Sequence, residues 1–192
     1  HEEKPTSWVT ETCLASTIVN PSTLLEEVMA DSRCIAFGPI HHYIVGAVLL
    51  ACYRNDEKDP HRDGQLADDL AELEKRSDCV PGAACARWGV CGAAASAGMA
   101  HAIIRGNGPL RAEGWSDGQR MVSRILERIA DAGAPRCCKR DSRIAIEEAT
   151  RTLNELLGCH LETPAERPVC DTMSANTVCL GPACPYHPAY TS

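Results

Sequence analysis

Two neighbouring cysteines, Cys137 and Cys138, carry the strongest chemical signal in the sequence. They lie in the stretch PRCCKRDS, between an arginine and a Lys-Arg pair, just before an expected helix. Positive charges and the N-terminal end of a helix dipole both stabilise a thiolate over a thiol. The pattern therefore favours a nucleophilic or metal-bound pair. The alternative is that Asp141 or Ser142 merely caps the helix and that the cations are solvated.

Three further cysteines, Cys170, Cys179 and Cys184, follow in a Pro-rich tail with the spacing C-x8-C-x4-C-P. A Cys-Pro pair also ends the common ferredoxin run, where all ligands are cysteine thiolates. The spacing here is looser than in ferredoxins, but it favours an iron–sulfur site. Structural zinc sites usually show C-x2-C pairs, which this tail lacks. Disulfides or free thiols are the remaining interpretation.

The surroundings of the other cysteines favour metal binding or reactivity at some positions and simple packing at others. Cys91 stands at the start of a Gly- and Ala-rich segment, where a helix N-terminus would help it to bind a cluster. Cys79 and Cys85 precede it at intervals of six residues and stay undecided. Four cysteines are expected to be ordinary small apolar residues: Cys13, Cys34, Cys52 and Cys159.

His41 and His42 open the most apolar segment of the chain. Adjacent residues on a helix point about 100° apart, so only one of the two can face any given site. Either is a candidate general acid or metal ligand. The alternative is that they are core histidines with satisfied hydrogen bonds.

These residues together predict an iron–sulfur protein, with a cluster of the 4Fe-4S type that serves as the centre of an enzyme. An iron left open would act as a Lewis acid on a small sulfur- or oxygen-containing substrate, as in a lyase or desulfidase. His41 or His42 would donate a proton, with Cys137 as a further catalytic residue. The expected metal ligands are Cys91, Cys138, Cys170, Cys179 and Cys184. The expected substrate-binding cations are Arg136, Lys139 and Arg140.

Two other functions stay open. One is a cofactor-free thiol oxidoreductase or sulfur carrier, in which Cys137 and Cys138 exchange with Cys91 and a redox or sulfur-transfer protein is the partner. The other is an interaction domain held together by zinc or disulfides. Zinc is thus the second expected cofactor.

Hydrophobic periodicity predicts an all-α fold with five to six helices around an Ala/Gly-rich central pair. One structural domain is expected, with a helical part over 1–158 and an irregular Cys-rich tail over 159–192 packed on it. Helices are expected over 22–31, 40–54, 66–73, 91–104, 116–132 and 142–157. The segment 40–54 is apolar nearly all round, so it should be the buried central helix.

Composition excludes several function classes. The chain has 192 residues, 12 cysteines and a net charge of -7. This acidic balance disfavours binding to nucleic acid or to anionic membranes. The longest apolar run, from Ile44 to Cys52, is far below the 20 or so residues of a membrane-spanning helix. Twelve cysteines, several of them in surroundings that suit metal or thiol chemistry, favour the reducing interior of a cell. A cytoplasmic location is therefore expected.

Four segments resemble a cysteine-rich family of unknown function found mainly in anaerobic archaea and bacteria. They are GPIHHYIVGAVLLACYRN, GVCGAAASAG, APRCCKRDS and the closing N-x2-C-x-G-x2-C-P, in order from residue 38 to about 188. CGAAASAG also resembles a redox-active Cys-Gly-Ala family. The resemblance implies an anaerobic cytoplasmic setting and cysteines that bind a metal cluster or undergo redox cycling. The family pattern has an acidic residue where this chain has Ile40, so any role of that carboxylate is absent here.

Overall fold

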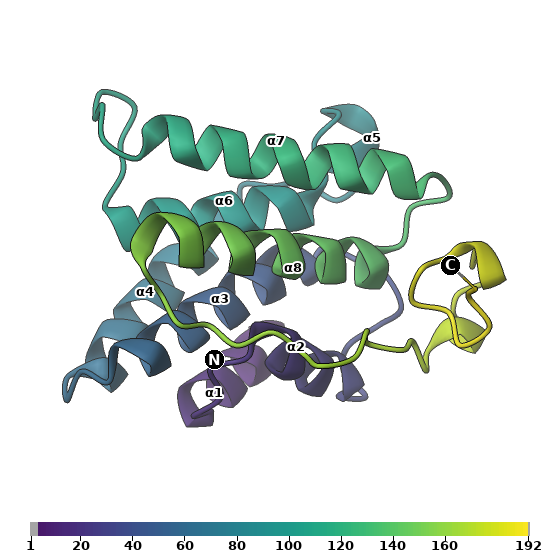
Figure 1. The fold of residues 1–192 in the computed structure, drawn as a ribbon, viewed down its shortest axis with the longest axis horizontal. Helices are drawn as coiled ribbons and strands as arrows, with labels where there is room; N and C mark the ends of the chain where they lie inside the picture. The colour runs from purple at the N-terminus through teal and green to yellow at the C-terminus, as the bar shows by residue number, and fades with distance from the viewer. Residues whose placement is uncertain (1–3, 192) are drawn as a thin grey trace.

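The computed structural model describes residues 4–191, and within them the chain is entirely helical apart from its connections and tail (Figure 1). The all-α prediction is confirmed. The α-helices are α1 (Ser7–Ala15), α2 (Pro21–Ala30), α3 (His41–Glu57), α4 (Arg62–Ser77), α5 (Ala84–Arg87), α6 (Gly92–Arg105), α7 (Trp115–Ala132) and α8 (Cys138–Leu157). Two short 3-10 helices, η1 (Met173–Ala175) and η2 (Gly181–Ala183), follow in the tail.

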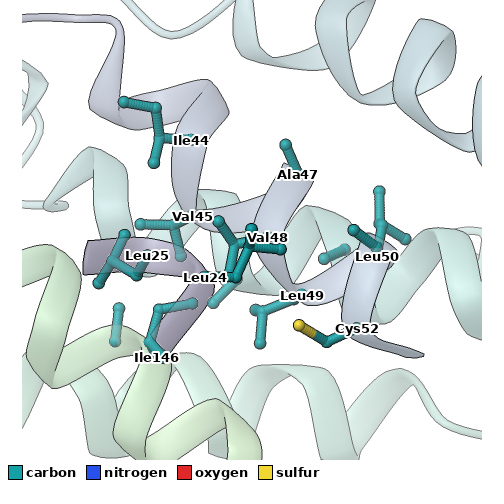
Figure 2. Packing of buried hydrophobic residues seen from close by; sticks show 14 of the residues in the cluster. Leu24, Leu25, Ile44, Val45, Ala47, Val48, Leu49, Leu50, Cys52 and Ile146 are labelled. Atoms are coloured by element: carbon teal, nitrogen blue, oxygen red, sulfur yellow. The ribbon is translucent and has the colours of Figure 1, made fainter. Parts of the chain in front are cut away.

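Helix α3 is the centre of the bundle, as its uniformly apolar sequence predicts. Its residues from Tyr43 to Cys52 are all buried, and it packs against α6, α4, α8, α2 and α1. Figure 2 shows its side chains meeting Leu24 and Leu25 of α2 and Ile146 of α8. The expected central helix pair is therefore α3 with the Ala-rich α6.

Helices α3 and α6 approach closely because small residues face each other. The backbone N–H of Gly46 donates to Ser96 Oγ at 2.8 Å. A Cβ at position 46 would lie 2.7 Å from Leu73 Cδ1 and 3.0 Å from the backbone oxygen of Ser96. The helix-destabilising glycine is therefore offset by tight packing.

Gly46→Ala is expected to destabilise the protein, although alanine favours helices. Overpacking costs about 1–3 kcal/mol and the gain in helix propensity is about 1 kcal/mol, so we expect a net loss of up to about 2 kcal/mol in urea unfolding. Gly64→Ala is the matched control, because a Cβ at Gly64 in α4 meets nothing within 4 Å. It should stabilise the protein by up to about 1 kcal/mol. Equal effects at the two positions would contradict this interpretation of the α3–α6 contact.

Several predicted helix boundaries were wrong. Helices α1 and α5 were not predicted, and α3 continues to Glu57 through residues expected to form a loop. Helix α2 is capped by Asn20, whose Oδ1 accepts from the backbone N–H of Thr23 at 3.1 Å, rather than by Thr23 itself. Helix α7 follows Gly114, so the expected cap Ser116 lies inside it.

The largest boundary correction concerns α8. It begins at Cys138, four residues before the expected start, and Cys137 is its N-cap residue. Asp141 and Ser142 therefore lie inside the helix and are buried, so the alternative in which they cap it is wrong. The two adjacent cysteines consequently occupy the first turn of a 20-residue helix.

The tail returns to the start of α8. Helix α8 ends at Gly158, whose φ of 64° is left-handed, and the chain then runs back along the bundle toward the N-terminal end of the same helix (Figure 1). Asn154 holds the turn through hydrogen bonds of 2.9 and 3.0 Å to the backbone of Leu161. Glu162 then donates its backbone N–H to Val19 O at 3.0 Å. The 3-10 turns of the tail thereby reach Cys137.

Over residues 4–191, none of the helices combines the length and the apolar character needed to cross a lipid bilayer.

Candidate functional site

Four cysteines line one small cavity at the N-terminal end of α8. Cys137 comes from the helix, and Cys170, Cys179 and Cys184 come from the tail. The cavity has a volume of about 30 Å³. The remaining lining residues are Ala36, Lys139, Arg140, Arg143, Thr172, Met173, Asn176 and His187. Thiols almost fifty positions apart in the chain thus meet at one place.

Hydrogen bonds from the protein reach three of these sulfur atoms. Cys137 Sγ accepts from the backbone N–H of Arg140 at 3.5 Å, and Cys179 Sγ accepts from that of Gly181 at 3.3 Å. Cys170 Sγ lies 3.5 Å from Thr172 Oγ1. Burial raises the pKa of Cys170, but Thr172 and the nearby Arg143 guanidinium outweigh it, so this pKa lies below its usual value. These donors suit sulfur in its thiolate form.

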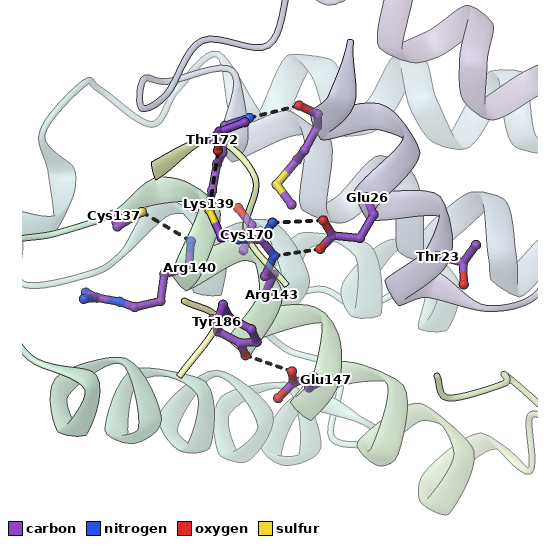
Figure 3. A network of polar contacts seen from close by, with 12 residues as sticks. Thr23, Glu26, Cys137, Lys139, Arg140, Arg143, Glu147, Cys170, Thr172 and Tyr186 are labelled. Atoms are coloured by element: carbon purple, nitrogen blue, oxygen red, sulfur yellow. Dashed lines mark hydrogen bonds and ion pairs between the residues drawn. The ribbon is translucent and has the colours of Figure 1, made fainter. Parts of the chain in front are cut away.

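One hydrogen bond within the tail and one from the tail to α8 hold the tail in place. Cys170 donates its backbone N–H to Tyr186 O at 2.7 Å, and the Tyr186 hydroxyl donates to Glu147 at 2.8 Å (Figure 3). The Arg143 guanidinium lies 5.4 Å from the centre of the Tyr186 ring. The cavity wall is therefore formed by two segments that hold each other in place.

Three buried cations surround the cavity: Lys139, Arg140 and Arg143, with exposed fractions of 2%, 2% and 3%. Arg143 forms a two-point ion pair with Glu26, at 2.6 and 2.9 Å (Figure 3). Arg140 pairs with Asp141 at 3.0 Å. Two of the three cations thus have a carboxylate partner, and the cavity keeps positive charge beside its thiols.

Arg143 was not among the predicted site residues. A signal was present, because positions 137, 140 and 143 recur every three residues and so share one side of a helix. It could be used only if the helix began at Cys138. Arg136, predicted beside Lys139 and Arg140 as a substrate-binding cation, is exposed instead and stacks on Phe37 at 4.8 Å.

Cys138 lies on a different side of α8 from Cys137, near Cys91. Neither Cys138 nor Cys91 lines the four-cysteine cavity. Cys91 is the N-cap residue of α6, and its thiol lies 3.9 Å from Asp141 Oδ2. Burial, the Asp141 carboxylate and Cys138 together raise the pKa of Cys91 to about 12. This second group therefore favours protonated thiols.

The expected thiolate-stabilising effect of the cations at Cys137 and Cys138 is outweighed by burial. Burial raises the pKa of both thiols, even though backbone N–H groups and the cations Arg136 and Arg140 lower it. Burial thus favours the thiol form over the thiolate at both positions. A bound metal would reverse this, because a coordinating thiol is deprotonated.

The two histidines face different neighbours, as adjacent helix positions require. His41 Nδ1 lies 3.0 Å from Gly38 O and its Nε2 lies 3.8 Å from Cys34 Sγ. The His42 ring covers Gly92, where a Cβ would come within 2.0 Å of it. Neither ring lines the four-cysteine cavity, whose only imidazole is that of His187.

The cavity cysteines do not form a ready-made metal site. In residues 4–191, no three or more His, Cys, Asp or Glu side chains are grouped so as to hold one metal ion. A cluster spreads four thiolates over several irons and therefore needs its ligands further apart than one ion does. Since the cavity of 30 Å³ has about the volume of one water molecule, binding requires the tail turns to shift outward.

All twelve cysteines fall within the described residues, and all are free thiols. Cys13 and Cys52 are fully buried in the core, as their apolar surroundings predict. Cys79 is exposed on α4's C-terminal side, where its thiol lies 3.5 Å from Lys75 O. These cysteines are far from the cavity lining and serve as natural controls.

A family model described as a family of unknown function (DUF5714) matches residues 9–187. The comparison with curated proteins gave no match, and neither did the comparison with solved structures.

Proposed function

The chain belongs to DUF5714, a family of unknown function, and from the arrangement of its thiols we propose that it is an iron–sulfur protein. The proposed ligands are Cys137, Cys170, Cys179 and Cys184. One observation carries the proposal, namely that these four thiols line a single cavity. The set keeps three of the ligands expected from the sequence and has Cys137 in place of Cys138 and Cys91.

The surroundings of the cavity support a cluster of negative charge. Four thiolates with a 4Fe-4S core carry net negative charge, which buried Lys139 would partly balance, since Arg140 and Arg143 are already paired with Asp141 and Glu26. Backbone N–H groups at Cys137 and Cys179 add hydrogen bonds to sulfur, one of the means by which proteins set a cluster potential. A cluster bound here would supply a one-electron redox centre.

Ligation by all four thiols favours electron transfer over substrate activation. It leaves no iron site for a substrate, whereas Lewis-acid catalysis requires an open coordination position. We therefore favour a redox role with a protein partner over the lyase or desulfidase role.

Anaerobic reconstitution with ferrous iron and sulfide tests the proposal directly. We expect brown protein with a broad visible absorption that bleaches on reduction, and equal amounts of bound iron and acid-labile sulfide. An electron paramagnetic resonance signal should appear in the reduced state.

Two results would contradict the iron–sulfur proposal. One is colourless protein without iron after reconstitution of a folded sample, as judged by its circular dichroism. The other is one tightly held zinc per chain that iron and sulfide fail to replace, which would indicate a structural zinc site instead.

A further inference from the structure

A second cavity, of about 330 Å³, lies at the end of the bundle opposite to the four cysteines. It opens between the C-terminal half of α6, the loop over 106–114 and the first turns of α7, whereas the tail reaches the N-terminal end of α8 (Figure 1). Its lining includes His101, Asn107 and Trp115. The volume falls at the lower end of the range of small-molecule sites in proteins, about 300–1,000 Å³.

Three buried polar atoms of this lining have no hydrogen-bond partner in the described part of the chain. They are the two ring nitrogens of His101 and Oδ1 of Asn107. His101 is only 1% exposed. Buried polar groups in proteins nearly always have a partner, and a group left without one lowers the stability of the fold. These atoms therefore indicate that a molecule other than the protein completes their hydrogen bonds.

Two glycines keep side chains away from the unpartnered groups. A Cβ at Gly118 in α7 would lie 3.1 Å from His101 Nδ1, and a Cβ at Gly114 would lie 3.2 Å from Asn107 Oδ1. Gly114 also has a φ of 80°, which residues with a side chain rarely adopt. The sequence thus leaves space next to each group that a larger residue would fill.

The charges around the cavity favour a neutral ligand. Within residues 4–191, its lining contains no Asp, Glu, Lys or Arg. Two charged residues that act on His101 already have partners, since Arg105 pairs with Glu113 at 2.6 Å and Asp117 pairs with Arg120 at 3.5 Å. Burial lowers the pKa of His101 below its usual value. The imidazole is therefore neutral near pH 7, with one N–H donor and one acceptor nitrogen.

We propose that this cavity binds a small neutral planar molecule that carries an amino group next to a hydrogen-bond acceptor, as adenine and nicotinamide do. The side-chain oxygen of Asn107 can only accept, so the ligand must donate an N–H to it. His101 can accept a second hydrogen bond from the amino group or donate one to the acceptor. Trp115, which is 47% exposed, and Pro109 add flat apolar surfaces on which an aromatic ring can stack.

An NMR titration of the full chain tests the proposal, with adenine and nicotinamide as the probes. We expect the indole N–H signal of Trp115 and the backbone signal of Asn107 to shift in a saturable way, with a Kd below about 1 mM for at least one probe. If neither probe gives a saturable shift of these signals up to about 5 mM, solvent alone serves the three atoms and the proposal is overturned.

Two matched compounds test the role of the amino group. Hypoxanthine has an oxygen in place of the amino group of adenine, and nicotinate has a charged carboxylate in place of the amide of nicotinamide. Each should bind at least about tenfold more weakly than its parent probe, because the Asn107 oxygen would lose its donor. Equal binding of a control and its parent would contradict the proposed ligand class.

Two variants connect binding to the unpartnered atoms. His101→Phe keeps a ring in the buried position without its nitrogens. Asn107→Ala removes the amide oxygen, while the backbone N–H of residue 107 still donates to Ala102 O. Each should weaken binding of the better probe at least about tenfold. His101→Phe should also leave the thermal midpoint of the ligand-free protein unchanged or higher, because it removes two unpartnered buried atoms.

His61→Phe is the matched control, since His61 is exposed and lies outside the cavity lining. It should bind the probes as the unsubstituted chain does. Undiminished binding in folded His101→Phe or in folded Asn107→Ala would show that the probe does not contact these atoms, and would overturn the proposal.

Discussion

Cys170→Ser is expected to weaken retention of the reconstituted iron at least about tenfold, measured as the iron remaining after incubation with EDTA. Loss of groups that merely support metal ligands already costs 10–100-fold in affinity, so loss of a ligand should cost no less. Serine also replaces a soft thiolate by a hard hydroxyl, which iron–sulfur clusters disfavour. The same result is expected for Cys184→Ser, since both side chains line the cavity.

Cys79→Ser is the control for this experiment. Cys79 is exposed and lies outside the cavity lining, so its substitution should leave iron and sulfide contents unchanged. Cys138→Ser distinguishes the proposed ligand set from the one expected from the sequence, because it should retain iron whereas Cys137→Ser should lose it. Iron loss in Cys138→Ser with full retention in Cys137→Ser would reverse the assignment of these neighbours.

The sequence could not predict which of Cys137 and Cys138 would line the cavity. Adjacent residues at a helix start point in different directions, but which direction meets the tail depends on how the tail returns. That return is set by non-local contacts, such as Glu162 with Val19 and Tyr186 with Glu147. The sequence predicted one site for the three tail cysteines with Cys138 and Cys91, whereas in the structure the tail cysteines line a cavity with Cys137 instead.

Helix boundaries were harder to predict than helix identity. The apolar pattern identified α3 and its central position, but α1 has little amphipathic character and α5 is a single turn of four residues. Cysteine is also not a residue expected to cap a helix, so the early start of α8 at Cys138 was missed. Because of that error, Arg143 was not predicted as a residue of the site.

Cys34 is buried, as predicted, but its contacts with Lys139 and His41 could not be predicted from the sequence. A cysteine with few polar neighbours in the sequence is usually a packing residue. Its partner Lys139 lies 105 positions away and reaches it only because α8 packs against α2. His41 is closer in sequence, but its ring orientation depends on the Gly38 carbonyl.

The ion pair of Arg143 with Glu26 links α8 to α2 beside the Tyr186 ring of the tail, and Arg143→Met is expected to lower the free energy of unfolding by about 2–3 kcal/mol. Breaking a buried ion pair costs about 3–5 kcal/mol, but Glu26 keeps a side-chain exposure of 33% and can be hydrated after the substitution. The Tyr186 ring loses its cation contact as well. Urea unfolding with a fixed m-value would measure the change.

Arg151→Met is the matched control on the same helix, because the Arg151 side chain is 47% exposed and pairs with Glu155 at the surface, and because buried Glu148 keeps Arg128 at 3.8 Å after the substitution. It should cost less than about 1 kcal/mol. A second readout distinguishes tail release from general destabilisation. Chymotrypsin should cleave after the buried Tyr186 about tenfold faster in Arg143→Met under conditions where both variants stay folded. Equal cleavage in the two variants would mean that the tail is held without Arg143, and the cavity wall would then depend on the Tyr186–Glu147 hydrogen bond.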